Sequence, residues 1–130
     1  MLIPSATTAN TPNNPYEAII SKLTAPAAIP PGSYVLTIDF TNKYNRAGVG
    51  IYKTVSRGDP YLFTQFEARD ARRAFPHFDE PQFKVPWELT LTVPATHAAL
   101  SNTQVLSEVP AGEGLKVVRF AKTPPLPSYL

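Results

Sequence analysis

The chain has 130 residues, a formal net charge of +2 and no cysteine, which excludes disulfide bonds and thiolate chemistry. This length suits one domain, and a compact chain of this size buries roughly two-thirds of its unfolded surface. The 12 basic and 10 acidic side chains are too evenly balanced for a nucleic-acid-binding surface, and no apolar stretch approaches the ~20 residues that span a membrane. We therefore expect neither nucleic acid nor a membrane as a partner.

Proline is the most informative part of the composition, at 15 of 130 residues against an average of ~5%. The prolines are dispersed among short apolar runs rather than clustered. Because proline breaks helix interiors but is tolerated at turns and strand ends, this distribution favours short strands joined by turns.

The first part of the chain predicts a tail followed by two strands. Residues 1–15 are rich in Thr, Asn, Ala and Pro without an apolar period, which predicts a disordered tail. Residues 17–23 form a weaker strand pattern because the adjacent Ile19 and Ile20 break the alternation. Residues 34–41 alternate clearly between apolar and other side chains, which predicts a half-buried strand.

The same period of two continues along the rest of the chain, with one interruption. It predicts further strands at residues 49–54, 61–68, 87–93, 105–108 and 115–121, the last two paired across a turn. Trp87 begins the clearest of these strands and is expected in the core. Between them, Asp70 suits a helix N-cap and Pro76 a helix stop, so one helical turn is expected near residues 70–75. The predicted fold is all-β, an antiparallel β-sandwich or a saddle-like sheet.

Residues 64–81 read TQFEARDARRAFPHFDEP. This segment closely resembles TQFE-x-x-DARRAFPCFDEP, the signature found in the N-terminal domain of the aminopeptidase N family of zinc metallo-aminopeptidases. The similarity extends over roughly residues 17–130, and His77 stands where the family usually has cysteine. The resemblance implies that residues 16–130 are a partial N-terminal β domain, without its early strands. Such a domain covers the active site of a parent enzyme that releases the first residue of peptides.

The zinc site of that parent enzyme is expected to lie outside this chain. The family binds zinc through His-Glu-x-x-His, but the chain contains only His77 and His97, neither followed by glutamate. The family's Gly-x-Met-Glu-Asn loop is absent too, since Met1 is the single methionine. We therefore expect no catalytic residue and no metal ligand here, and no activity from the chain alone. The implied partners are the catalytic domain and the N-terminus of a peptide.

Gln65 and Glu67 are the candidate substrate-binding residues. Their i, i+2 spacing in the predicted strand 61–68 would turn both side chains to one face. By resemblance, Glu67 accepts hydrogen bonds from the substrate's α-ammonium group and Gln65 lines the pocket for the first side chain. The spacing by itself favours an ordinary solvated pair on the outer face of a strand.

Other polar clusters favour structural roles. Arg69, Arg72 and Arg73 have acidic neighbours, so ion pairs are expected rather than a phosphate site. Adjacent residues of an extended chain point to opposite sides, so Asp79 and Glu80 do not suit a catalytic pair, and Asp79 is expected to form a turn. Residues 48–50 (Gly-Val-Gly) lack the third glycine and the helix of a phosphate loop, which favours a strand bend.

Two other functions fit the same sequence. The chain could be a free-standing β-sandwich that serves as a binding or scaffold module without catalysis, or an incomplete gene product without independent function. The downstream reading frame separates these alternatives, because a His-Glu-x-x-His continuation would indicate an enzyme.

Overall fold

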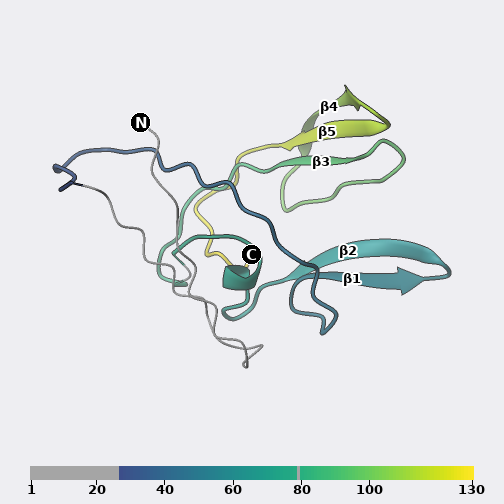
Figure 1. The fold of residues 1–130 in the computed structure, drawn as a ribbon, viewed down its shortest axis with the longest axis horizontal. Helices are drawn as coiled ribbons and strands as arrows, with labels where there is room; N and C mark the ends of the chain where they lie inside the picture. The colour runs from purple at the N-terminus through teal and green to yellow at the C-terminus, as the bar shows by residue number, and fades with distance from the viewer. Residues whose placement is uncertain (1–26, 79) are drawn as a thin grey trace.

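A computed structural model describes residues 27–78 and 80–130. The described chain contains the strands β1 (Gly50–Ser56), β2 (Asp59–Gln65), β3 (Thr90–Pro94), β4 (Val105–Gly112) and β5 (Leu115–Phe120), and the 3-10 helix η1 (Ala71–Arg73). β1 and β2 form one antiparallel sheet, and the order β3-β5-β4 forms the other (Figure 1). The predicted all-β class, the antiparallel pairing and the short helical turn are confirmed.

Tight turns with positive φ angles connect both hairpins. Arg57 (φ 53°) and Gly58 (φ 91°) join β1 to β2, while Glu113 (φ 49°) and Gly114 (φ 73°) join β4 to β5. Positive φ at both central residues gives a turn whose twist matches that of the paired strands. These local turns explain why the predicted strands 49–54, 105–108 and 115–121 are found close to their expected positions.

Burial in the larger sheet is concentrated on its central strand. Val118 is fully buried and Phe120 nearly so, both on β5, which pairs with β3 on one side and β4 on the other. Most residues of the two edge strands are exposed or only half-buried. The apolar packing of this sheet therefore depends on β5.

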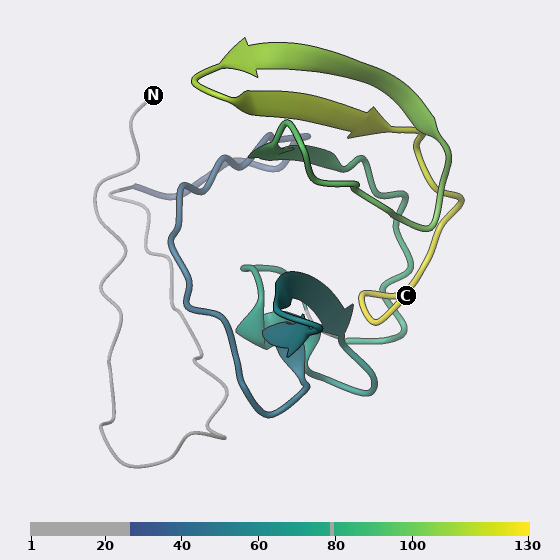
Figure 2. The same ribbon diagram turned by 90° about the vertical axis from the view of Figure 1, so that its right-hand side faces the viewer.

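The predicted strand at residues 34–41 is wrong. These residues form no ladder with any described strand, and the alternating side chains expected to form the buried face are largely solvent-exposed, Tyr34 to 62% and Phe40 to 53%. Figure 2 shows this segment as a single trace that runs from the level of the larger sheet down to β1 and β2. Alternation of apolar and polar side chains indicates which face of a strand would be buried, but it does not provide the neighbouring strand that a ladder requires. The other expectations for this region, the tail at 1–15 and the strand at 17–23, lie outside the described residues.

Trp87 also differs from its expected place. β3 begins at Thr90, so Trp87 lies before the strand, and its side chain is half-buried rather than in the core. Its backbone N–H donates to Thr123 Oγ1 at 2.9 Å, its carbonyl accepts from the Thr123 N–H at 3.0 Å, and its indole Nε1 donates to the Leu126 carbonyl at 3.1 Å. The ring meets that of Phe75 edge to face, with centroids 5.7 Å apart. Trp87 thus joins the segment before β3 to the end of the chain.

We expect Trp87→Ala to lower the free energy of unfolding by about 2–3 kcal/mol, less than the ~3–5 kcal/mol lost when a fully buried large aromatic ring is truncated. Trp87→Phe should cost less, because it keeps most of the ring packing and loses the indole hydrogen bond. Denaturant unfolding followed by far-ultraviolet circular dichroism measures both. Leu100→Ala is the control, since Leu100 is 90% exposed. If Trp87→Ala matches the control, these contacts contribute nothing to stability.

Residues 34–41, an apolar segment that pairs with no described strand, predict that the isolated chain self-associates. An extended segment outside any sheet offers unpaired backbone groups and apolar side chains to another copy. Light scattering should give an apparent mass that rises with concentration, and Val35→Lys should weaken that rise by adding a charge to the segment. A single monomeric species at high concentration would contradict the prediction.

Candidate functional site

The two candidate residues lie at the end of β2, but not both within it. Gln65 is the last residue of the strand, and residues 67–70 form a turn that contains Glu67. The predicted strand 61–68 is therefore too long, and the strand alternation that would align the two side chains does not reach Glu67. Both residues are exposed. Gln65 pairs across the ladder with Gly50, which has no side chain to cover it.

Backbone hydrogen bonds fix the turn that carries Glu67. The Asp70 N–H donates to the Phe66 carbonyl at 2.8 Å, and the Arg73 N–H donates to the Asp70 carbonyl at 3.0 Å. The first of these bonds joins residues i and i+4 and closes a single α-turn. The helix η1 begins at the next residue, Ala71. The position of Glu67 is thus determined by the backbone from Phe66 to Arg73.

The side chains of η1 explain why it lies close to its neighbours. Ala71 is fully buried and Ala74, at its end, is 1% exposed. Asp70 makes no side-chain hydrogen bond as an N-cap; instead its Oδ1 lies 2.6 Å from Arg73 Nε. The ion pairing predicted for this arginine-rich segment is confirmed at Arg73.

The start of β1 contacts η1 closely. A Cβ atom at Gly50 would lie 3.3 Å from the Arg73 Cβ and 3.8 Å from the Asp70 carbonyl oxygen. Gly50 also has a φ of 67°, and Gly48 one of 75°, a region that side chains disfavour. This confirms the expected bend at residues 48–50, and it shows why glycine is needed where the bend meets η1.

Sequence reasoning missed Asn42. Its Nδ2 donates to the Arg73 carbonyl at 2.5 Å and to the Ala74 carbonyl at 3.1 Å. These bonds join residues 31 and 32 positions apart, and no local pattern marks the asparagine. Only the three-dimensional arrangement could reveal it.

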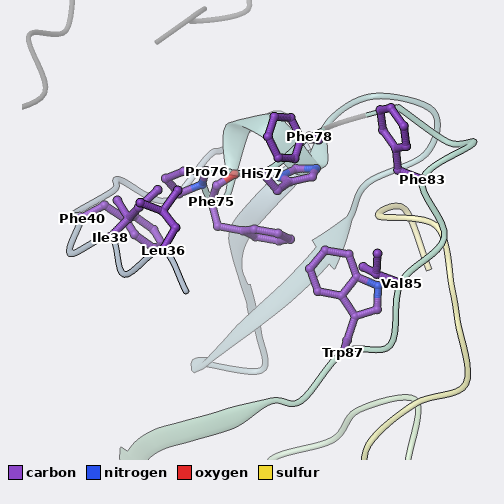
Figure 3. Close-up of a pocket in the computed structure, with 10 residues that line it drawn as sticks. All are labelled: Leu36, Ile38, Phe40, Phe75, Pro76, His77, Phe78, Phe83, Val85 and Trp87. Atoms are coloured by element: carbon purple, nitrogen blue, oxygen red, sulfur yellow. Dashed lines mark hydrogen bonds between the residues drawn. The ribbon is translucent and has the colours of Figure 1, made fainter. Parts of the chain in front are cut away.

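Beyond η1, aromatic side chains surround an open pocket of about 450 Å³. Figure 3 shows the rings of Phe75, His77 and Trp87 close together, between Leu36, Ile38 and Phe40 on one side and Phe83 on the other. The lining residues are Leu36, Ile38, Phe40, Phe75, Pro76, His77, Phe78, Phe83, Val85 and Trp87. Neither Gln65 nor Glu67 is among them, so the pocket and the candidate residues are separate features.

His77 packs among these rings. Its Nδ1 lies 2.9 Å from the Phe75 carbonyl oxygen, and its ring centroid is 4.5 Å from that of Phe75 and 6.3 Å from that of Trp87. The residue that departs from the family signature thus has a packing role. Of the predicted Asp79–Glu80 turn, Asp79 lies outside the described residues, and Glu80 is exposed with its N–H bonded to the Phe78 carbonyl at 2.9 Å.

The described residues offer no set of metal ligands. Within 27–78 and 80–130, no three His, Cys, Asp or Glu side chains gather in a way that could hold an ion. Over the same part of the chain, no helix has the length and apolar character needed to cross a bilayer.

We expect the purified chain to hold less than stoichiometric zinc after dialysis. Zinc sites in proteins need three or four converging nitrogen, sulfur or oxygen ligands, and the described part of the chain provides none. Elemental analysis by inductively coupled plasma mass spectrometry measures the metal content. One tightly bound zinc per chain would contradict the prediction.

Comparisons with known proteins identify the family of the chain. The family described as the peptidase M1 N-terminal domain matches residues 4–130. Aminopeptidase N of Acetobacter pasteurianus is 39% identical over 110 residues, covering 81% of this chain and 31% of the relative. Aminopeptidase M1-B of Oryza sativa subsp. japonica is 42% identical over 106 residues, covering 78% of this chain and 12% of the relative. Human glutamyl aminopeptidase is 34% identical over 103 residues, covering 76% of this chain and 11% of the relative. The chain spans less than a third of the length of each relative.

Proposed function

The chain belongs to the peptidase M1 N-terminal domain family, and on this premise we propose that it is the non-catalytic part of a zinc aminopeptidase. In this role the domain covers the active site and anchors the free N-terminus of a peptide while its first residue is released. The proposal assigns the zinc and its ligands to a catalytic domain; among residues 27–78 and 80–130, no three His, Cys, Asp or Glu side chains gather into a metal site. The full protein's reaction is hydrolysis by a zinc-activated water.

The observation that carries this proposal is the exposed carboxylate of Glu67 on a turn whose backbone is fixed. A carboxylate offers only acceptors, and an α-ammonium group offers three donors, so the two form charge-assisted hydrogen bonds. A site holds its ligand well when the supporting backbone is fixed in advance. Two features supply that support: the hydrogen bond from the Asp70 N–H to the Phe66 carbonyl, which closes the turn around Glu67, and η1, which follows the turn.

Gln65 has a different part in the proposal. Its carboxamide is uncharged, so it distinguishes a charged N-terminus poorly, but it can donate to and accept from a polar side chain. It is exposed and lies at the strand end, opposite Gly50. We therefore assign to Gln65 contact with the first side chain of the peptide, and to Glu67 contact with the amino group.

We expect Glu67→Ala, in the protein that joins this domain to its catalytic domain, to lower kcat/KM for free-amine peptides about ten- to a hundredfold. A net loss of roughly 1.5–3 kcal/mol for a charge-assisted hydrogen bond gives that range. Wild type should reject N-acetylated substrates, which leave the carboxylate unpaired, and the variant should lose much of this discrimination. Steady-state kinetics on matched free and acetylated substrates measures both effects.

Two further variants sharpen the test. Gln65→Ala should alter preference among first side chains and leave the selectivity for free amines nearly intact. Glu88→Ala is the control, because it removes another exposed carboxylate, one that pairs with Lys122 at 3.2 Å before β3. If Glu67→Ala cleaves free-amine peptides at the wild-type rate, Glu67 is an ordinary surface residue and the anchor is wrong.

The alternative function is a free-standing β-sandwich that binds a partner without catalysis. One observation favours it: the exposed rings of Tyr61 and Phe63 stack on one face of β2, with centroids 6.2 Å apart. Exposed aromatic residues are common where proteins bind one another. The reading frame that follows the codon for Leu130 decides between the two functions. A continuation that encodes His-Glu-x-x-His supports the enzyme, and a stop codon supports the module.

A further inference from the structure

We propose that Asn42 is a positioning residue for Glu67, acting through η1 and without contact to the substrate. This inference rests on the proposed role of Glu67 as the anchor. Asn42 is exposed, lies outside both sheets, and precedes β1 by several residues. What connects it to the site is the pair of hydrogen bonds made by its carboxamide.

The chemistry of the carboxamide matches the groups it meets. The last carbonyls of a helix have no partner within the helix and need a donor from elsewhere. Asn42 Nδ2 supplies that donor to both Arg73 and Ala74, at 2.5 and 3.1 Å. Its Oδ1 accepts from the Lys43 N–H at 2.7 Å, which fixes the orientation of the amide group. Both ends of the carboxamide are therefore used, and a carboxylate of the same shape could make only the second contact.

The path from these carbonyls to Glu67 is short. Within η1, the Arg73 N–H bonds to the Asp70 carbonyl, and the Arg73 guanidinium pairs with the Asp70 carboxylate. The Asp70 N–H in turn bonds to the Phe66 carbonyl and closes the turn in which Glu67 lies. A shift of η1 would therefore move the backbone of Glu67 directly.

Glu67 depends on this support because its side chain is exposed. Displacement of a binding group by about 1 Å can cost up to ~100-fold in rate even when the substituted residue is remote from the chemistry. Gly50 limits the movement of η1 from one side by close contact, and Asn42 holds its end by hydrogen bonds. We infer that loss of the Asn42 donors would release η1 at its C-terminal end.

The test uses the protein that joins this domain to its catalytic domain. Asn42→Asp keeps the size of the side chain, removes both donors and places a carboxylate beside two carbonyl oxygens. Asn42→Ser shortens the side chain and adds no negative charge beside the two carbonyls, so it is the milder variant if Asn42→Asp folds poorly. Gln104→Glu is the matched control, because it makes the same chemical change at an exposed residue just before β4.

For Asn42→Asp we expect KM for free-amine substrates to rise about tenfold, with a smaller effect on kcat and with weaker discrimination against acetylated substrates. Asn42→Ser should fall between this variant and wild type, and the control should match wild type. A purely structural defect would instead lower the active fraction, so kcat would fall and KM would stay constant. In a Glu67→Ala background, Asn42→Asp should have little further effect on KM, since the group it positions is gone.

Amide hydrogen exchange provides an independent measurement. The Asp70, Arg73 and Ala74 amides should exchange faster in Asn42→Asp, while those of β5 should not change. Unchanged exchange and KM would overturn the inference. Faster exchange with unchanged KM, while Glu67→Ala raises KM, would show that Asn42 holds η1 without positioning Glu67, and the anchor would stand. If Glu67→Ala itself has no effect, both proposals are wrong.

Discussion

The packing of η1 is the constraint on which the rest of the candidate site depends. This single turn brings together distant parts of the chain: Gly50 at the start of β1, Asn42 before it, and the rings that continue from Phe75 to Trp87. The alanines at its start and just after its end are among the few buried apolar residues of the described chain. Larger side chains at these positions would hold η1 away from its neighbours. The close approach then fixes the turn before η1, where Glu67 lies.

The small amount of burial elsewhere has a physical consequence. Among the described residues the buried apolar side chains are those of Ala71, Ala74, Val118, Phe120 and Pro127, while many large apolar side chains are exposed. Burial of apolar surface supplies most of the favourable free energy of folding, roughly 25 cal/mol per Å². Covering the exposed apolar side chains against another protein surface would add to this free energy. Relatives several times longer than this chain are consistent with such a surface in the same polypeptide.

Sequence patterns predicted the elements that form from neighbouring residues. They failed where contacts with distant segments determine the structure. The two hairpins were predictable because alternating residues flank turns such as Glu113–Gly114. Residues 34–41 alternate as well as any strand, but no pattern within them supplies a partner. Trp87 pairs with Thr123 and Leu126 outside any regular strand, which alternation cannot reveal. The signature identified Gln65 and Glu67. It did not reveal that β2 ends between them, because that end depends on the turn closed by Asp70 and on η1. Nor did it reveal the hydrogen bond from Asn42 to Arg73, which joins residues more than 30 positions apart.

A carboxylate on a turn is held differently from one on a strand. Inside a sheet, ladder hydrogen bonds on neighbouring residues hold each position independently of any single side chain. Glu67 lies beyond the ladder, so its position depends on η1 and on whatever holds η1. Gly50 links the two halves of the site, because it is the ladder partner of Gln65 and also the residue that contacts Arg73. A side chain at position 50 would require a strained φ and would press on η1, so it would disturb the turn that carries Glu67 while leaving Gln65 on its strand. On the roles proposed for Glu67 and Gln65, selectivity for the amino group would be more sensitive to distant substitutions than preference for the first side chain.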